Sequence, residues 1–260
     1  MVGQGPPPRY RFPGRLEEGV VLARPNRFIM TVRDKEGGGT LTCHCPATGR
    51  LGEVSISGVP CLFSRAADGG AATAKKRKTA GTVEAISLDP PERRSRSWVG
   101  INQSAANRYV EFFLRAGRMP GLASGEVRRE VRLGASRIDF LVGGTTYVEV
   151  KTPLTVLPMP AALARSRHTR FDSFDRLIRH MGELGASLGE EESEGGGRRA
   201  VILLCYLYDA EPFEPPARDG QNAPVLEAAR RAAELGVERW QANMRVDAGG
   251  VRMLRYFRNG

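Results

Sequence analysis

The sequence has little cysteine and histidine and no long apolar run. Its 260 residues include four cysteines and three histidines, and four cysteines are too few for a dense disulfide framework. No stretch is long enough to span a bilayer as an apolar helix, and the first residues carry no hydrophobic signal-peptide core. We therefore expect a soluble intracellular protein, in the cytoplasm or nucleoid, with reduced thiols and no membrane partner.

Several catalytic motifs are also missing. The chain has no Gly-x-Ser-x-Gly elbow, no Gly-x-x-x-x-Gly-Lys-Ser/Thr loop and no Gly-x-Gly-x-x-Gly fingerprint. These absences argue against a hydrolase triad and a nucleotide-binding enzyme. A zinc site built from Cys43, His44, Cys45 and Cys61 is disfavoured, because the first three residues lack the spacing of a zinc knuckle. Thiols on a β-strand are the favoured interpretation.

The charge balance is strongly basic. Lysine and arginine total 39 against 29 aspartate and glutamate residues, which gives a formal net charge of +10 and a pI of about 9.9. Hydrophobic residues make up 41% of the chain, enough for a packed core. A basic surface suits a polyanionic partner, because each phosphate contact releases condensed counterions.

Residues 15–101 show short apolar runs separated by turns, which predicts a small barrel or an open sandwich. The expected strands lie at 19–22, 28–32, 40–45, 59–63 and 82–86. A Gly/Ala-rich loop at 66–80 ends in the basic run Lys75-Lys76-Arg77-Lys78. We expect this run to contact nucleic acid.

From residue 102 the pattern changes to helix, three strands, helix, strand and further elements. Ser104 is expected to cap a helix that runs to Gly117. Strands are expected at 126–133, 137–142, 146–151, 201–207, 237–242 and 251–257, and helices at 172–185 and 224–235. The polar segment 187–199 is expected to be a disordered insertion.

The chemically informative segment is 137–151. Strand side chains alternate, so Glu149 and Lys151 share one face. If residues 143–145 form a three-residue hairpin loop, Asp139 lies opposite Glu149. Ile138 and Phe140 then join Val148 and Val150 in the core below.

Two adjacent carboxylates repel each other unless a cation lies between them. Mg²⁺, or Mn²⁺ in its place, is usually held by one or two carboxylates, waters and substrate phosphate. Such an ion lowers the pKa of a bound water, and Lys151 would orient that water or neutralise developing charge. The alternative is a solvated strand face with two acids and a lysine.

Flanking residues extend the hypothesis. Glu111 on the helix after residue 104 is a candidate third carboxylate, and Glu130 competes with it; an ordinary surface glutamate is the alternative. Arg176, Arg179 and His180 share one helix face and are candidate phosphate contacts, with an ordinary basic face as the alternative. Arg137, beside Asp139, is a further candidate nucleic-acid contact.

The Asp139…Glu149-Val150-Lys151 pattern, with strand 201–207 behind it, resembles the PD-(D/E)XK nuclease superfamily. More closely, the chain resembles the sugar fermentation stimulation protein A (SfsA) family over most of residues 15–257. The motifs that carry this resemblance are His44-Cys45-Pro46-Ala47-Thr48-Gly49, Trp98-Val99-Gly100-Ile101-Asn102, Asn107-Arg108-Tyr109-Val110-Glu111, Arg129-Glu130-Val131, Ser136-Arg137-Ile138-Asp139-Phe140-Leu141 and Tyr147-Val148-Glu149-Val150-Lys151.

The resemblance implies a mixed α/β fold. An N-terminal OB-fold-like β-barrel, residues 15–101, would precede a restriction-endonuclease-like αβββαβ domain, residues 102–260. It also implies DNA binding without marked sequence preference. Carried over, Asp139 and Glu149 would be metal ligands, Lys151 the catalytic lysine and Glu111 the helix-borne acid. The chain departs from the family at Ala47, where asparagine is usual, and at 157–161.

Three hypotheses about function follow. The first is a Mg²⁺-dependent phosphodiesterase that acts on DNA, with RNA as a second candidate substrate. The second is a non-specific DNA-binding regulatory protein with little or no cleavage, which the altered segment 157–161 favours. The third is a protein–protein module, against which the basic charge argues.

Overall fold

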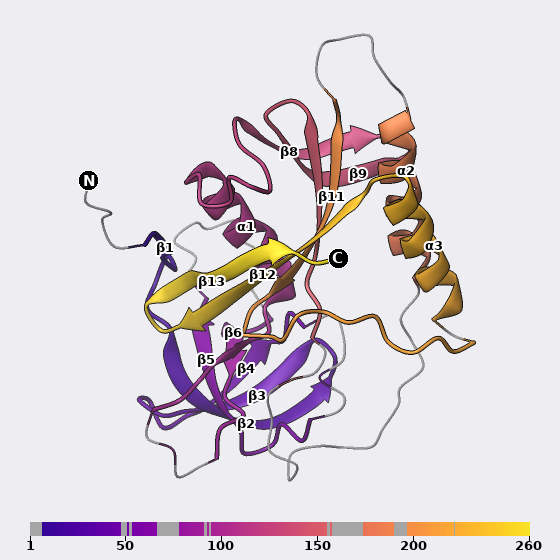
Figure 1. The fold of residues 1–260 in the computed structure, drawn as a ribbon. Coiled ribbons are helices and arrows are strands. Elements are labelled where there is room, and N and C mark those ends of the chain that lie inside the picture. The colour runs from indigo at the N-terminus through magenta and orange to yellow at the C-terminus, as the bar shows by residue number, and fades with distance from the viewer. Residues whose placement is uncertain are drawn as a thin grey trace.

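The computed structural model of the chain describes residues 7–47, 51, 54–66, 78–90, 93, 95–154, 157, 174–189, 197–220 and 222–260. These residues form a mixed α/β structure with a six-stranded and a seven-stranded sheet. The strands of the smaller sheet lie below the larger sheet and its helices in Figure 1. No helix among the described residues is long and apolar enough to cross a bilayer.

The smaller sheet closes into a barrel. Its strands are β2 (Glu17–Asn26), β3 (Ile29–Asp34), β4 (Thr40–His44), β5 (Pro60–Arg65) and β6 (Gly81–Ile86), and the short β7 (Val99–Gly100) pairs with β6. The order is β4-β3-β2-β5-β6, and a parallel pairing of β4 with β6 completes the ring of five strands. This arrangement confirms the expected OB-like barrel.

The barrel cysteines behave as apolar core residues. Cys43, Cys45 and Cys61 are free thiols and all are buried. Burial raises the pKa of Cys43 to about 11 and that of Cys61 to about 12. Thiols with raised pKa in apolar surroundings are poor nucleophiles and poor metal ligands. This geometry supports the interpretation of these residues as thiols on strands.

The larger sheet has the order β1-β13-β12-β11-β10-β9-β8. Its strands are β1 (Arg9–Tyr10), β8 (Val127–Leu133), β9 (Ser136–Val142), β10 (Thr146–Lys151), β11 (Arg199–Tyr206), β12 (Glu238–Asp247) and β13 (Gly250–Arg258). Strands β10, β11 and β12 run parallel and the other pairs are antiparallel. The apolar run of β11 lies at the centre, where both faces are covered, as its composition predicts.

Helices cover the two faces of this sheet (Figure 1). Helix α1 (Ala106–Arg115) packs on one face through its apolar stripe, and α2 (Asp175–Gly189) and α3 (Ala223–Glu234) pack on the other. The expected cap at Ser104 is wrong, because the helix is preceded by a 3₁₀ turn at Gln103–Ala105. Asn102 caps this turn: its side chain accepts from the Ala105 N–H at 3.1 Å and from the Ser104 hydroxyl at 2.8 Å.

The barrel and the larger sheet meet at β7. The Gly100 N–H donates to the Leu207 carbonyl at 2.8 Å. Beside it, the Asn102 side-chain amide donates to Glu84 Oε2 at 2.6 Å, in a buried position. These bonds connect β6 of the barrel to the start of α1, which carries side chains toward the acidic pair.

Candidate metal centre

The hairpin of β9 and β10 positions the predicted acidic pair. Its register joins Val142 to Thr146 and Phe140 to Val148, so residues 143–145 form the loop as the sequence predicts. Gly143 and Gly144 adopt φ values of 61° and 76°, a left-handed conformation that glycine adopts without a steric penalty. Continued by one residue, the same register places Asp139 opposite Glu149.

A backbone distortion interrupts the neighbouring strand pair at the same level. The pairing of β8 with β9 skips Glu130 and Asp139, and Glu130 has φ of 53°, unlike any other non-glycine residue that the structure describes. Phe140 packs in the cluster against α1, whereas Ile138 packs in the cluster against α2. The predicted shared core of Ile138 and Phe140 is therefore wrong, because strand parity changes at this distortion.

Asp139 occupies the gap in the strand pairing. Its Oδ2 accepts the backbone N–H of Val150 at 2.8 Å, and its Oδ1 accepts the side-chain amide of Asn107 at 2.6 Å. Burial raises the pKa of Asp139, and the charge of Glu149 raises it further. A raised pKa in the folded state means that the charged carboxylate is unfavourable there at neutral pH. A bound cation would relieve this cost.

Glu149 is buried, with 2% of its surface exposed. Its Oε1 accepts Lys151 Nζ at 2.6 Å and lies 2.5 Å from Nδ1 of His180. Its Oε2 is also buried and has no hydrogen-bond partner among the described residues. A buried carboxylate oxygen without a donor costs free energy unless a cation or a water contacts it.

One cavity of about 360 Å³ collects these groups. Asp139, Glu149 and Lys151 line it, together with Gln103, Ser104, Asn107, Val150, Thr152 and Arg176. The described residues contain no group of three or more His, Cys, Asp or Glu side chains suited to a metal ion. Two carboxylates with waters are nevertheless a sufficient protein ligand set for Mg²⁺. The donor set therefore fits this ion, which Asp139 and Glu149 would hold.

Helix α1 brings a different residue to this cavity from the one the sequence suggests. Asn107 contacts Asp139, whereas Glu111, one turn later, pairs with Arg115 at 3.0 Å and Arg129 at 3.1 Å. Glu111 does not line the cavity. Asn107 lies in the motif Asn107–Glu111, but an uncharged amide on a helix gives no sign in the sequence that it contacts a carboxylate. The role of Glu111 as a third acid stays a prediction.

The structure also separates the predicted phosphate contacts. His180 is buried, with 2% exposure, and contacts Glu149, so it does not share the accessible face of Arg176 and Arg179. Arg176 is exposed and lines the cavity, and Arg179 is exposed outside its lining. Arg137 is exposed, with its guanidinium 3.9 Å from Glu130. Lys78 is exposed, while 75–77 lie outside the described residues.

His180 supports the orientation of Glu149, a role that the sequence reasoning missed. The replacement His180→Ala is expected to weaken Mn²⁺ binding by about 10-fold or more, because partners that orient a metal ligand typically have effects of this size. Calorimetric titration of Mn²⁺ measures the change. Arg179, the exposed residue next to His180, supplies the control. The Arg179→Ala variant should bind Mn²⁺ as tightly as the wild type does. An unchanged affinity in His180→Ala would show that Glu149 does not need this contact.

The fold and the site define a class of protein in which a closed OB-like barrel precedes a mixed α/β sheet that carries an acidic pair on two neighbouring strands. Residues 22–101 match the SfsA N-terminal OB domain, and residues 104–250 match the sugar fermentation stimulation protein RE domain. The chain belongs to the sugar fermentation stimulation protein family.

Relatives that match this chain over nearly all of both sequences support this assignment. The chain is 33% identical to a sugar fermentation stimulation protein homolog of Synechococcus sp. (strain JA-2-3B'a(2-13)), over 97% of this chain and 96% of the relative. It is 35% identical to the homolog of Methylobacterium sp. (strain 4-46), over 94% and 95%. The structure of Pyrococcus furiosus SfsA in complex with Ca²⁺ has the same fold, with a TM-score of 0.68 and 22% identity, covering 95% of this chain and 96% of that one.

Proposed function

We propose that this protein is a Mg²⁺-dependent phosphodiesterase that acts on DNA. The observation that carries the proposal is the buried Oε2 of Glu149, which has no hydrogen-bond partner among the described residues and belongs to the same cavity as Asp139 and Lys151. Protein interiors rarely leave such an oxygen without a partner. A divalent cation between the two carboxylates would satisfy it and would also offset the repulsion that raises the pKa of Asp139.

Six of the residues that line the cavity have a defined part in the proposed reaction. Asp139 and Glu149 hold the ion, and Asn107 and the Val150 N–H keep Asp139 in place. The ion, when bound, supplies an activated water and stabilises charge on the phosphate oxygen. Lys151, held against Glu149 and 26% exposed, directs its ammonium group to the developing negative charge. Arg176, on the cavity rim, binds a neighbouring phosphate.

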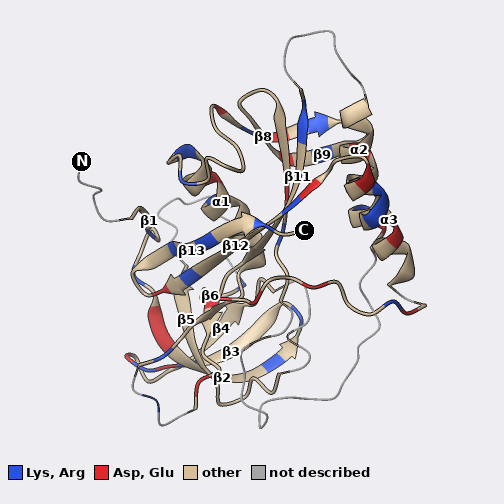
Figure 2. Cartoon of the chain, in the orientation of Figure 1, with Lys and Arg blue, Asp and Glu red and all other residues tan. Residues whose placement is uncertain are grey.

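The basic charge of the chain supports a polyanionic substrate, and its similarity to a Ca²⁺-bound structure supports a hard cation. Figure 2 shows lysine and arginine along β8, β12 and β13, consistent with the formal net charge of +10. The Pyrococcus furiosus SfsA structure is described as a complex with Ca²⁺. Ca²⁺ takes the same oxygen ligands as Mg²⁺ and differs mainly in size and coordination number.

A cleavage assay tests the proposal. Purified protein is incubated with labelled single-stranded DNA, double-stranded DNA or RNA, in Mg²⁺, Mn²⁺ or EDTA. We expect cleavage that requires metal, that is lost in Asp139→Ala, and that falls by about 10²-fold or more in Lys151→Ala, the usual effect of removing one charge-stabilising group. Equal products from wild type and both variants would show that a contaminant cleaves the substrate.

One observation favours a second function, that of a DNA-binding regulatory protein without turnover. Glu111 is tied by two ion pairs to Arg115 and Arg129, so the helix contributes an amide rather than an acid to the cavity. In this case the same assay would show binding that weakens steeply with salt and no cleavage in any metal.

A further inference from the structure

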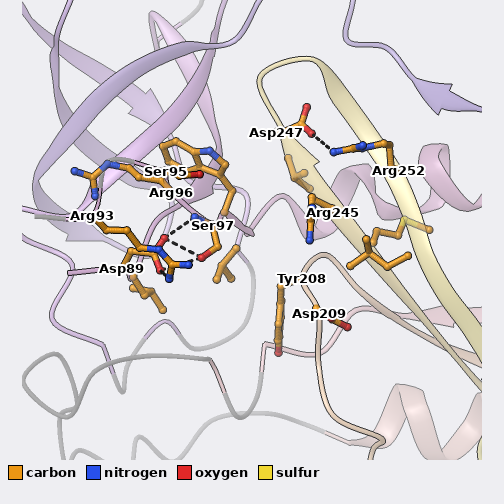
Figure 3. A pocket seen from close by; sticks show the side chains of 16 residues that line it. Asp89, Arg93, Ser95, Arg96, Ser97, Tyr208, Asp209, Arg245, Asp247 and Arg252 are labelled. Carbon is orange, nitrogen blue, oxygen red and sulfur yellow. Dashed lines mark hydrogen bonds and ion pairs between the residues drawn. The ribbon is translucent and has the colours of Figure 1, made fainter. Parts of the chain in front are cut away.

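A second and larger cavity lies between residues 88–89, 93 and 95–99 on one side and the hairpin of β12 and β13 on the other (Figure 3). Its volume is about 650 Å³, within the range of small-molecule sites. No residue lines both this cavity and the one around Asp139. Its charged lining consists of four arginines and three aspartates: Arg93, Arg96, Arg245, Arg252, Asp89, Asp209 and Asp247.

Arginines stand in a row across three strands beside this cavity. The register pairs Arg9 of β1 with Arg252 of β13, and Arg252 with Arg245 of β12. Like charges directly opposite each other destabilise a sheet. Asp247 compensates two of them, at 3.5 Å from Arg9 and 3.2 Å from Arg252. The exposed side chain of Arg245 has no hydrogen bond or ion pair with any residue that the structure describes, and Nε of Arg252 is buried without a partner among them.

The aspartates of the cavity do not neutralise Arg245, because each is already engaged elsewhere. Asp89 accepts from Arg93 at 2.9 Å and from the Ser97 hydroxyl at 2.8 Å. Asp209 pairs with Arg255, outside the cavity lining, at 3.1 Å and accepts the Asn243 amide at 3.0 Å. Positive charge is therefore in excess, and Figure 3 shows Arg245 directed into the space between the two sides.

Apart from Ser95 and Ser97, the remaining lining residues are apolar. Leu88, Val99 and Tyr208 are buried there, and Trp98 is half-buried. A cavity that joins Arg245, which has no ionic partner among the described residues, and the neighbouring Arg252 to an aromatic and aliphatic wall suits a ligand with an anionic end and a flat ring. Two arginines held side by side match the oxygens of one phosphate group.

We propose that this cavity binds a small phosphate monoester of nucleotide size, with the phosphate held by Arg245 and Arg252 and the ring against the apolar wall. The site is separate from the acidic pair, and the proposal does not depend on phosphodiesterase activity. The bound phosphate would supply the negative charge that the arginine row lacks.

Calorimetric titration of the full chain with deoxyadenosine monophosphate tests this proposal, with deoxyadenosine as the uncharged probe. We expect saturable binding of the monophosphate, at least about 10-fold weaker binding of deoxyadenosine, and a loss of about 10-fold or more in Arg245→Gln, since charge-assisted bonds to phosphate are strong. The matched control is Arg218→Gln, at an exposed arginine outside the cavity, which should bind as wild type does.

Folding of the key variant is checked by thermal melting. Arg245→Gln removes like-charge repulsion and should melt at or above the temperature of the wild type without ligand. No binding of the monophosphate, or equal binding by wild type and Arg245→Gln, would overturn the proposal. A single-stranded oligonucleotide is titrated in the same way. If its binding requires Arg245 and the monophosphate does not bind, the arginines contact backbone phosphates of a nucleic acid, and the proposal is overturned.

Discussion

Glu149→Gln is expected to reduce metal-dependent DNA cleavage by about 10³-fold, because a metal ion contributes several kcal/mol to transition-state stabilisation. The amide keeps the size of the side chain and can still accept from Lys151. It removes the negative charge of a side chain that is 2% exposed and whose Oε2 has no protein partner among the described residues. Single-turnover cleavage rates in saturating Mg²⁺ measure the effect.

The matched control for this prediction is Glu126→Gln. Glu126 is exposed just before β8 and lies outside the cavity lining. The Glu126→Gln variant should therefore cleave DNA at the rate of the wild type. Removing a buried charge should leave the metal-free melting temperature of Glu149→Gln unchanged or higher, which shows that the variant folds. A Glu149→Gln rate within a few-fold of wild type would contradict the assignment of Glu149 as a metal ligand.

Gly100→Ala is expected to destabilise the protein by about 3 kcal/mol, at the upper end of the usual cost of overpacking. A Cβ at this position would lie 2.5 Å from Leu207 Cβ, 2.7 Å from Val246 Cγ2 and 2.9 Å from the Leu207 carbonyl oxygen. Two of these atoms belong to the backbone or are fixed directly to it, so they cannot turn away. Relieving this steric clash would move β7 away from the larger sheet and break the hydrogen bond from the Gly100 N–H to the Leu207 carbonyl.

Urea denaturation measures this effect through the free energy of unfolding. Gly39→Ala is the control, because a Cβ at that position has nothing within 4 Å, and its free energy of unfolding should change by less than about 0.5 kcal/mol. Equal stabilities of the two variants would show that the barrel and the sheet are not tightly packed at β7. A selective loss in Gly100→Ala identifies this junction as a packed interface within the fold.

Local sequence patterns predict much of this fold. The five barrel strands, the hairpin loop at 143–145 and the order of elements after residue 102 follow from turn residues and apolar periodicity, and the structure confirms them. The two-residue strands β1 and β7 are missed, because two residues carry no periodicity. Their positions depend on pairing partners that are distant in the sequence.

The candidate site is only partly predictable. The alternation of side chains along a strand correctly places Glu149 and Lys151 on one face. It gives the wrong face for Ile138, because the backbone distortion at Glu130, opposite Asp139, is a tertiary feature that the local sequence does not reveal. The contact of His180 with Glu149 depends on how α2 packs over the sheet, which helical spacing alone does not reveal. The contact of Asn107 with Asp139 likewise depends on the position of α1.

The most direct test of the metal centre is Mn²⁺ binding measured by electron paramagnetic resonance, with wild type, Asp139→Ala, Glu149→Gln and Glu126→Gln side by side. We predict saturable binding to wild type and Glu126→Gln, and affinity at least about 10-fold weaker in the two cavity variants. Equal Mn²⁺ affinity in all four proteins, or no saturable binding by wild type, would contradict a metal centre at Asp139 and Glu149.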